Sequence, residues 1–178
     1  MAPESESSFD RQAFRRALGQ FPTGVCVVTC SAEFEQLGMT ISSFNCLSLE
    51  PPLILFSIDR EAVSLPLWEK AAGYAVNVLS ENQRDISNRF AKSRSNKWEG
   101  TRCARGRCGA PLLPGVAAVF ECIPWARYDA GDHILFIAEV RNFTSSIDRM
   151  PLVFSKGRYA ALQSTEFVAP IWPLDIHY

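Results

Sequence analysis

Small hydroxyl side chains gather in one short stretch of the sequence, Gly38-Met39-Thr40-Ile41-Ser42-Ser43-Phe44. Thr40, Ser42 and Ser43 are set among apolar residues, which is typical of a β-strand with one polar face. A strand that carries hydroxyl groups and free backbone amides into a cleft can donate hydrogen bonds to a flat ring with polar edges, or to a phosphate. The same residues could also occupy the solvent face of an ordinary strand. The pattern alone leaves both interpretations open.

The segment Gly131-Asp132-His133 is the second place where the residue types suggest chemistry. It lies where two predicted strands join, and His133 is one of only two histidines in the chain. A histidine in such a turn could contact a nicotinamide ring or move a proton. Gly-Asp is also an ordinary hairpin turn, which would leave His133 at the start of a strand without a chemical role. Both interpretations stay open.

Basic side chains are frequent between residues 89 and 107. Arg89 and Lys92, near the end of a predicted helix, could neutralise a pyrophosphate. A solvated loop explains most of the other charges in this stretch.

The cysteines are more typical of free thiols in a reducing compartment than of a metal site or a disulfide framework. Cys26 and Cys30 lie on one face of a predicted strand, but neither a histidine nor another cysteine pair stands at zinc spacing. Residues 1–6 lack the basic and apolar regions of a secretory signal, and cytoplasmic thiols stay reduced. We therefore expect a cytoplasmic protein with no metal site.

The elements that must position these residues are mostly strands. Apolar residues at helical spacing predict a helix at about 9–18, ended by Gly19. The spacing of Ser80 and Gln83 predicts a capping box that starts a helix to about Ala91, and another short helix should follow Pro66. Residues 92–115 read as a long irregular connection, which is usually functional or mobile in a compact domain. Strands are predicted at 24–30, 38–49, 53–58, 74–79, 116–128, 133–143, 152–155 and 158–162.

Many short strands and few helices predict a mainly β protein with an antiparallel barrel, because closing the sheet removes exposed strand edges. No Gly-x-Gly-x-x-Gly follows a strand, so a dinucleotide would not be held in the Rossmann manner. We expect one domain over 9–165, a disordered N-terminal tail over 1–8 and a C-terminal tail over 166–178. A net charge of −1 argues against nucleic-acid binding, and no apolar stretch reaches the roughly 18 residues of a membrane span.

The chain resembles the flavin reductase component family of two-component monooxygenases, over about residues 9–162. No single segment carries the resemblance; it depends on several in order. They are Phe21-Pro22-Thr23-Gly24-Val25, Gly38-Met39-Thr40 with Ser42-Ser43-Phe44, Ser48-Leu49 with Pro51-Pro52-Leu53, Ala75-Val76-Asn77-Val78-Leu79, Phe90-Ala91, Gly109-Ala110-Pro111-Leu112-Leu113, Glu121-Cys122, Gly131-Asp132-His133 and Gly157-Arg158-Tyr159. The resemblance implies a split β-barrel of Greek-key type with a few flanking helices.

The same resemblance implies where the cofactors bind. FMN or FAD would lie beside the strand from Gly38 to Phe44, and NADH (or NADPH) would contact the segment Gly131-Asp132-His133, with His133 as a positioning group. The flavin or its phosphates would be approached by Thr23, Met39, Thr40, Ser42, Ser43, Ser48, Ser57, Ser64, Phe90, Ala91 and Lys92, and Tyr159 is a further cofactor candidate. A homodimer that passes reduced flavin to a partner monooxygenase is also implied. Two alternatives stay open: a flavin-binding shuttle without catalysis, and a relative of the pyridoxamine-phosphate oxidases on the same barrel.

Overall fold

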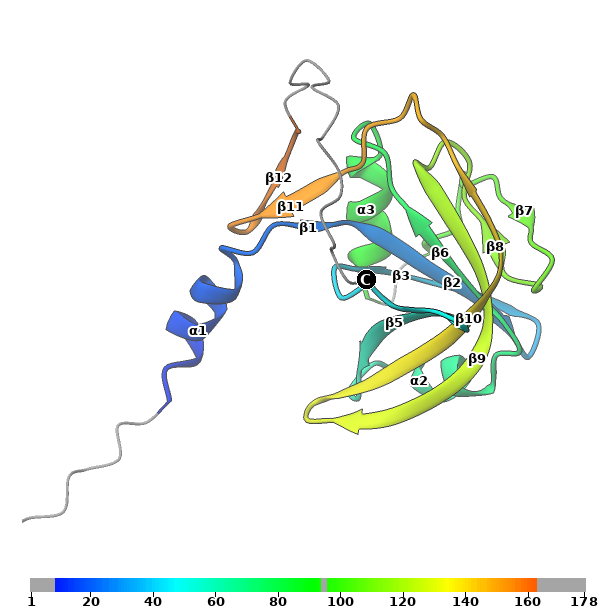
Figure 1. Ribbon diagram of the computed structural model, residues 1–178, viewed down its shortest axis with the longest axis horizontal. Coiled ribbons are helices and arrows are strands. Elements are labelled where there is room, and N and C mark those ends of the chain that lie inside the picture. The colour runs from blue at the N-terminus through cyan, green and yellow to red at the C-terminus, as the bar shows by residue number, and fades with distance from the viewer. Residues whose placement is uncertain (1–8, 94–95, 163–178) are drawn as a thin grey trace, which may run out of the picture.

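The computed structural model describes residues 9–93 and 96–162, and its largest element is a seven-stranded antiparallel sheet (Figure 1). The strand order is β3-β2-β6-β9-β10-β5-β4. These strands are β2 (Cys26–Ala32), β3 (Glu35–Ile41), β4 (Asn45–Leu49), β5 (Pro52–Asp59), β6 (Tyr74–Val78), β9 (Ala118–Ala130) and β10 (His133–Ser145). The strands expected at 24–30, 53–58, 74–79, 116–128 and 133–143 are present, with ends within two residues of those expected.

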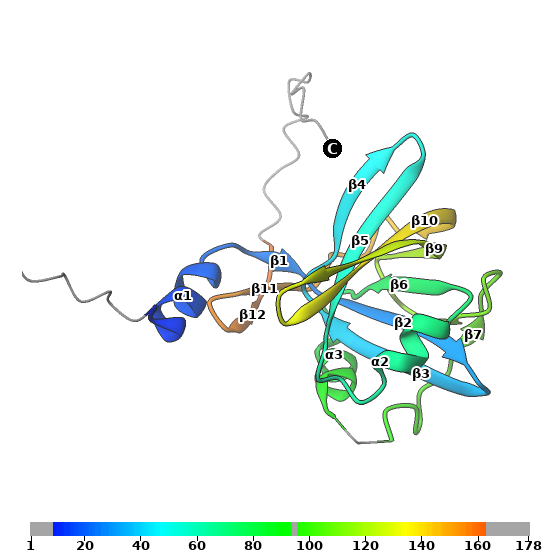
Figure 2. The same ribbon diagram turned by 90° about the horizontal axis from the view of Figure 1, so that it is seen from below.

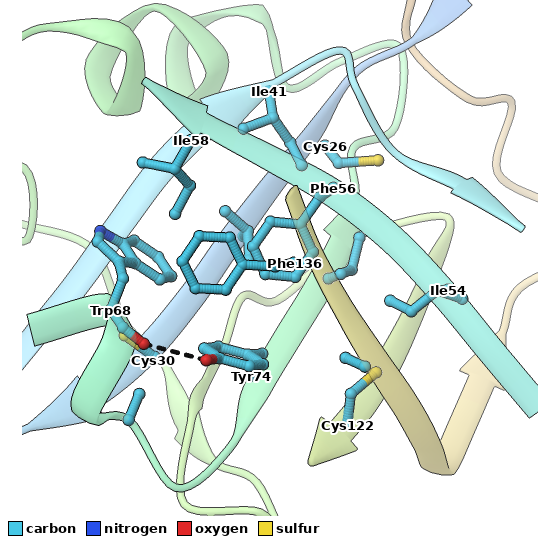
Figure 3. Close-up of a cluster of buried hydrophobic side chains, with 14 of the residues drawn as sticks. Cys26, Cys30, Ile41, Ile54, Phe56, Ile58, Trp68, Tyr74, Cys122 and Phe136 are labelled. Atoms are coloured by element: carbon cyan, nitrogen blue, oxygen red, sulfur yellow. Dashed lines mark hydrogen bonds between the residues drawn. The ribbon is translucent and has the colours of Figure 1, made fainter. Parts of the chain in front are cut away.

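The sheet curls around a single core. Ile41 lies on β3, at one edge of the sheet, and Ile54 lies on β5, next to the other edge, yet both belong to one buried cluster with Phe136 of β10. In Figure 3 this cluster includes Trp68, whose carbonyl accepts a hydrogen bond from the Tyr74 hydroxyl at 3.0 Å. Only a rolled sheet can bring these side chains together, so the predicted split β-barrel is confirmed.

The barrel is covered on one outer face. Strand β2 buries both faces, because Val28 points into the barrel core while Val27 packs in a second cluster with Phe90 of α3 (Arg84–Ala91). The connection after α3 adds Ala110 and Leu113 to this second cluster and forms two short strands, β7 (Ala104–Arg105) and β8 (Pro111–Leu112). Burial on both faces explains why β2 reads as a continuous apolar run.

Smaller elements complete the described chain. A separate sheet has the order β1-β11-β12, formed by β1 (Thr23–Gly24), β11 (Val153–Ser155) and β12 (Arg158–Ala160). Helix α2 (Leu65–Lys70) packs Trp68 into the barrel core. Among the helices of the described residues, none has the length and apolar character needed to cross a membrane.

Helix α1 (Arg11–Leu18) stands away from the barrel (Figures 1 and 2). The Asp10 carboxylate accepts hydrogen bonds from the backbone N–H groups of Gln12 and Ala13, at 2.9 and 3.0 Å, and so begins the helix. The apolar spacing predicted this helix, but no residue in it is buried, and Phe14 keeps half of its surface exposed. An amphipathic helix is thus present, and the rest of the described chain does not bury its apolar face.

One expected strand is wrong. The stretch from Gly38 to Leu49 forms two strands, because β3 pairs with β2 whereas β4 pairs with β5. These pairings place β3 and β4 at opposite edges of the sheet, and residues 42–44 cross between the edges. The alternation of small polar and apolar residues continues through the crossing, which is why it reads as one strand.

The capping box is half formed. The Ser80 N–H donates to the Gln83 side-chain oxygen at 3.0 Å, as predicted. The helix nevertheless begins three residues later than this box requires, at Arg84, because Ser80 to Gln83 closes a separate turn through the Gln83 N–H and the Ser80 carbonyl. The predicted tails, 1–8 and 166–178, lie outside the described residues.

Candidate functional site

A cleft of about 580 Å³ opens beside β3. It is lined by residues 35–39, 61–64 and 96–98, together with Leu67 and Ser93. Its volume falls within the roughly 300–1,000 Å³ of typical ligand sites. Two of the predicted site residues, Met39 and Ser64, are in this lining. The cleft therefore joins the hydroxyl-rich strand to the loop before α2.

The loop after α3 covers part of the free edge of β3. As an edge strand, β3 leaves every second backbone carbonyl without a strand partner. The carbonyl of Gln36 accepts from the Trp98 indole N–H at 2.7 Å, and that of Gly38 accepts from the Lys97 ammonium at 3.0 Å. By the same alternation, the backbone N–H and C=O of Thr40 lie on this edge. The edge thus presents backbone groups beyond the part that the loop covers.

Lys97 is a half-buried cation in the wall of the cleft. Its ammonium group also donates to the Phe90 carbonyl at 2.9 Å, so two of its three N–H groups have backbone acceptors. Burial lowers the pKa of Lys97 below that of a free lysine, because the charged form loses solvation.

Two other predicted site residues form hydrogen bonds with helix α3. The Thr40 hydroxyl donates to the Ser87 carbonyl at 2.7 Å, and the Tyr159 hydroxyl donates to the Ser87 side-chain oxygen at 2.8 Å. Phe90 is fully buried and packs edge-on against the Trp98 ring, with 5.0 Å between ring centroids. The Thr40 and Tyr159 hydroxyls and the Phe90 ring are therefore engaged within the protein and position its elements.

The crossing segment is held to β5. The Ser57 N–H donates to the Ser43 side-chain oxygen at 3.0 Å, which ties the middle of the crossing to a neighbouring strand. Ser42, one residue earlier, is exposed. Of the hydroxyls in this stretch, that of Ser42 is the one facing solvent without an intramolecular hydrogen bond among the described residues.

The turn with His133 is attached to the cleft through Arg60. Gly131 has a φ of 64°, which permits the tight turn between β9 and β10. The Arg60 side chain donates to the Gly131 carbonyl at 2.9 Å, and the Arg60 N–H donates to the Asp132 carbonyl at 3.0 Å. Residues 61–64, which follow Arg60 directly, line the cleft. The two candidate segments of the sequence therefore meet through one short loop.

His133 and Asp132 form a pair within this turn. The His133 Nδ1 lies 2.7 Å from a carboxylate oxygen of Asp132. Its hydrogen bond and charge lower the pKa of Asp132. The pair is exposed, so solvent screens it and it contributes little to folding.

Several predicted residues lie apart from the cleft. Thr23 pairs with Phe154 in the small sheet, and Ser48 pairs with Leu53 near the tip of the β4–β5 hairpin. Ala91 and Lys92 are exposed at the end of α3. None of these four is among the described residues that line the cleft. Their proposed contacts with flavin remain predictions.

Sequence reasoning missed Lys97, Trp98, Ser87 and Arg60. Arg89, expected near a phosphate, instead donates to the Glu99 carbonyl at 3.0 Å and the Thr101 hydroxyl at 2.7 Å, which ties α3 to its loop. Only the length and basic character of residues 92–115 pointed to this region. Nothing in the spacing of Lys97 and Trp98 indicates that they reach back to β3.

In a comparison with known protein families, residues 18–163 match the flavin reductase like domain. The chain is 38% identical to FMN reductase (NADH) SmoA of Agrobacterium fabrum over 88% of this chain and 87% of that protein. It is 31% identical to the reductase subunit HsaB of a flavin-dependent monooxygenase from Mycobacterium tuberculosis, over 96% of this chain and 92% of that protein.

A solved structure agrees in fold and sequence. It is the NADH:FAD oxidoreductase SgcE6 of Streptomyces globisporus C-1027, in complex with NAD and FAD fragments. The TM-score is 0.85, at 35% identity over 92% of this chain and 99% of that one. The likeness thus extends over nearly the full length of both proteins.

Proposed function

The chain belongs to the flavin reductase like family, and from this premise we propose that it transfers hydride from NADH (or NADPH) to FMN or FAD. The observation that supports this proposal most directly is the cleft beside the open edge of β3, joined through Arg60 to the turn that carries His133. Family membership favours this reaction over that of a pyridoxamine-phosphate oxidase relative.

The residues present fit a flavin. Its ring offers hydrogen-bond acceptors, and the exposed Ser42 hydroxyl and the edge N–H of Thr40 are donors of the required kind. Ser43 is held by Ser57 and so orients the crossing that carries Ser42. A bound flavin supplies the hydride-accepting ring, since that chemistry belongs to the cofactor.

The protein contributes orientation more than acid–base chemistry. Asp132 fixes the imidazole of His133 by the 2.7 Å contact, and Arg60 fixes the turn that holds both residues. His133 therefore acts as a positioning group for the nicotinamide. Correct placement of two reactants can contribute several kcal/mol to catalysis, about 7–11 in the best cases.

Reduced flavin then passes to a flavin-dependent monooxygenase, as the name of the HsaB relative indicates for that protein. The enzyme works as a homodimer, which would cover the exposed apolar face of α1. It acts in the cytoplasm, in keeping with its six free cysteines.

The test is NADH oxidation by purified protein, followed by absorbance, with FMN, FAD, riboflavin or no flavin. We expect turnover that depends on added flavin, and the rank order identifies the preferred one. NADPH in the same assay decides between the two nicotinamide cofactors. Flavin binding without NADH oxidation would contradict the enzyme and support the shuttle.

A further inference from the structure

The ammonium group of Lys97 can donate one more hydrogen bond than its contacts with the described residues account for. Two of its three N–H groups donate to the carbonyls of Gly38 and Phe90, at 3.0 and 2.9 Å. The side chain also lines the cleft, and its third N–H has no acceptor among the described residues. Burying an ammonium group costs free energy, and two neutral carbonyls compensate only part of its charge.

The charge of Lys97 is opposite in sign to that of the other charged side chains among the described residues that line the cleft. Lys97 is the one cationic side chain among the described residues of the cleft lining, which also contains Glu35 of β3 and Glu61 of the loop before α2. Arg89, on the neighbouring helix, is engaged with the carbonyl of Glu99. Among the described lining residues, an anion entering the cleft would therefore meet one fixed positive charge, at Lys97.

We propose that Lys97 anchors a phosphate of the nucleotide that binds in this cleft, through the N–H that Gly38 and Phe90 leave free. The anchor rests on the proposed function, because both substrates of that reaction carry phosphates. The phosphate belongs either to the flavin or to the nicotinamide dinucleotide. A charge-assisted hydrogen bond of this kind corresponds to about a tenfold to hundredfold change in affinity.

The anchor has a distinctive pH dependence. Burial lowers the pKa of Lys97, so its ammonium loses its proton at a lower pH than an ordinary lysine does. Phosphate affinity should therefore be greatest while Lys97 is charged and should fall as the pH rises through its lowered pKa. The other charged side chains among the described residues that line the cleft are the carboxylates of Glu35 and Glu61.

The experiment compares wild type with Lys97→Met, Lys97→Arg and the control Lys70→Met. Lys70 is an exposed lysine outside the cleft lining, paired with Glu33 at 2.7 Å. Binding of FMN and of riboflavin, which lacks the phosphate, is measured by flavin fluorescence. The KM for NADH is measured with riboflavin as acceptor. Thermal unfolding of each variant checks that it is folded.

Lys97→Met should weaken FMN binding about tenfold or more while leaving riboflavin binding unchanged, if the phosphate is that of the flavin. If it belongs to the dinucleotide, flavin binding is unchanged and the KM for NADH rises by a similar factor. In either case Lys97→Arg restores the affinity and removes its decline with rising pH, since arginine stays charged.

The anchor would be overturned if Lys97→Met weakened the binding of FMN and of riboflavin equally. It would also be overturned if the substitution changed neither flavin binding nor the KM for NADH. The first result would mean that Lys97 only holds the loop against β3. Failure of the proposed function is recognised separately, because wild type would then bind flavin without oxidising NADH and the fluorescence comparison would still report on Lys97.

Discussion

His133 sits on an exposed turn, where its imidazole is oriented by a neighbouring carboxylate and not by burial. This arrangement suits a group that positions a substrate, because solvent competes with any proton transfer. We therefore expect His133→Ala to raise the KM for NADH about tenfold and to change kcat much less. Steady-state kinetics at saturating flavin would measure both constants. A large fall in kcat at unchanged KM would instead identify His133 as a proton donor.

The contact between His133 and Asp132 also predicts that the pKa of Asp132 depends on His133. The pKa of Asp132 is lowered mainly by the hydrogen bond from His133. This interaction is present above the usual aspartate pKa and is lost as the pH falls through the lowered one. His133→Ala should raise the pKa of Asp132 toward its ordinary value, as followed by carboxyl NMR. An unchanged Asp132 pKa would show that the contact does not persist in solution.

The cysteines differ sharply in expected reactivity. Burial raises the pKa values of Cys26, Cys30 and Cys122 to about 12, so these thiols are not ionised at neutral pH. Cys46 is exposed on β4. Alkylation of native protein should modify Cys46 first, and the three buried thiols only after unfolding, as read by peptide mass spectrometry. The variant Cys46→Ser provides the control, and rapid native labelling of Cys26 would refute the expectation.

Strand β3 and helix α3 approach each other at Gly38. A Cβ there would overlap the ring of Phe90, which is fully buried and also contacts Trp98. We expect Gly38→Ala to reduce the free energy of unfolding by about 1–3 kcal/mol, as overpacking usually does, and to weaken flavin binding by displacing the loop. Urea unfolding and flavin fluorescence measure the two effects.

Gly24→Ala is the matched control for this packing. A Cβ at Gly24 meets no atom within 4 Å, and its φ is not among the positive values. The change in unfolding free energy should stay within about 0.5 kcal/mol. Equal effects of the two substitutions would mean that glycine matters at position 38 for backbone flexibility and not for contact with Phe90.

Within the part of the chain that the structure describes, the apolar side chains of helix α1 are left exposed. Phe14, Leu18 and Phe21 are 50%, 57% and 76% exposed, and side chains of this kind are buried in stable assemblies. If α1 contributes to the proposed homodimer, Phe14→Asp should raise the dimer dissociation constant about tenfold or more. Analytical ultracentrifugation at several concentrations measures this constant.

The control is an equally apolar residue elsewhere. Phe34 lies fully exposed at the β2–β3 turn with a φ of 70°, a conformation that aspartate tolerates well. Phe34→Asp should leave the dissociation constant unchanged. A monomeric wild type, or equal effects of both substitutions, would argue against a dimer formed through α1.

Local patterns in the sequence determined most of the architecture. The short β-branched runs around Cys26–Ala32 and Tyr74–Val78 predicted strands, and the scarcity of helices predicted a mainly β barrel. The residues of Gly38 to Phe44 and of Gly131 to His133 were also identified locally, since hydroxyl groups, glycines and a histidine are informative wherever they stand.

Only the tertiary structure decided how these parts meet. The crossing at 42–44 depends on β3 and β4 pairing with different strands, and pairing partners far apart in the sequence leave no local pattern. Lys97 and Trp98 reach carbonyls about sixty residues earlier in the chain, so their place in the cleft was invisible in the sequence. Periodicity reports which face of an element is apolar, whereas the element that covers that face is chosen by packing over the entire chain.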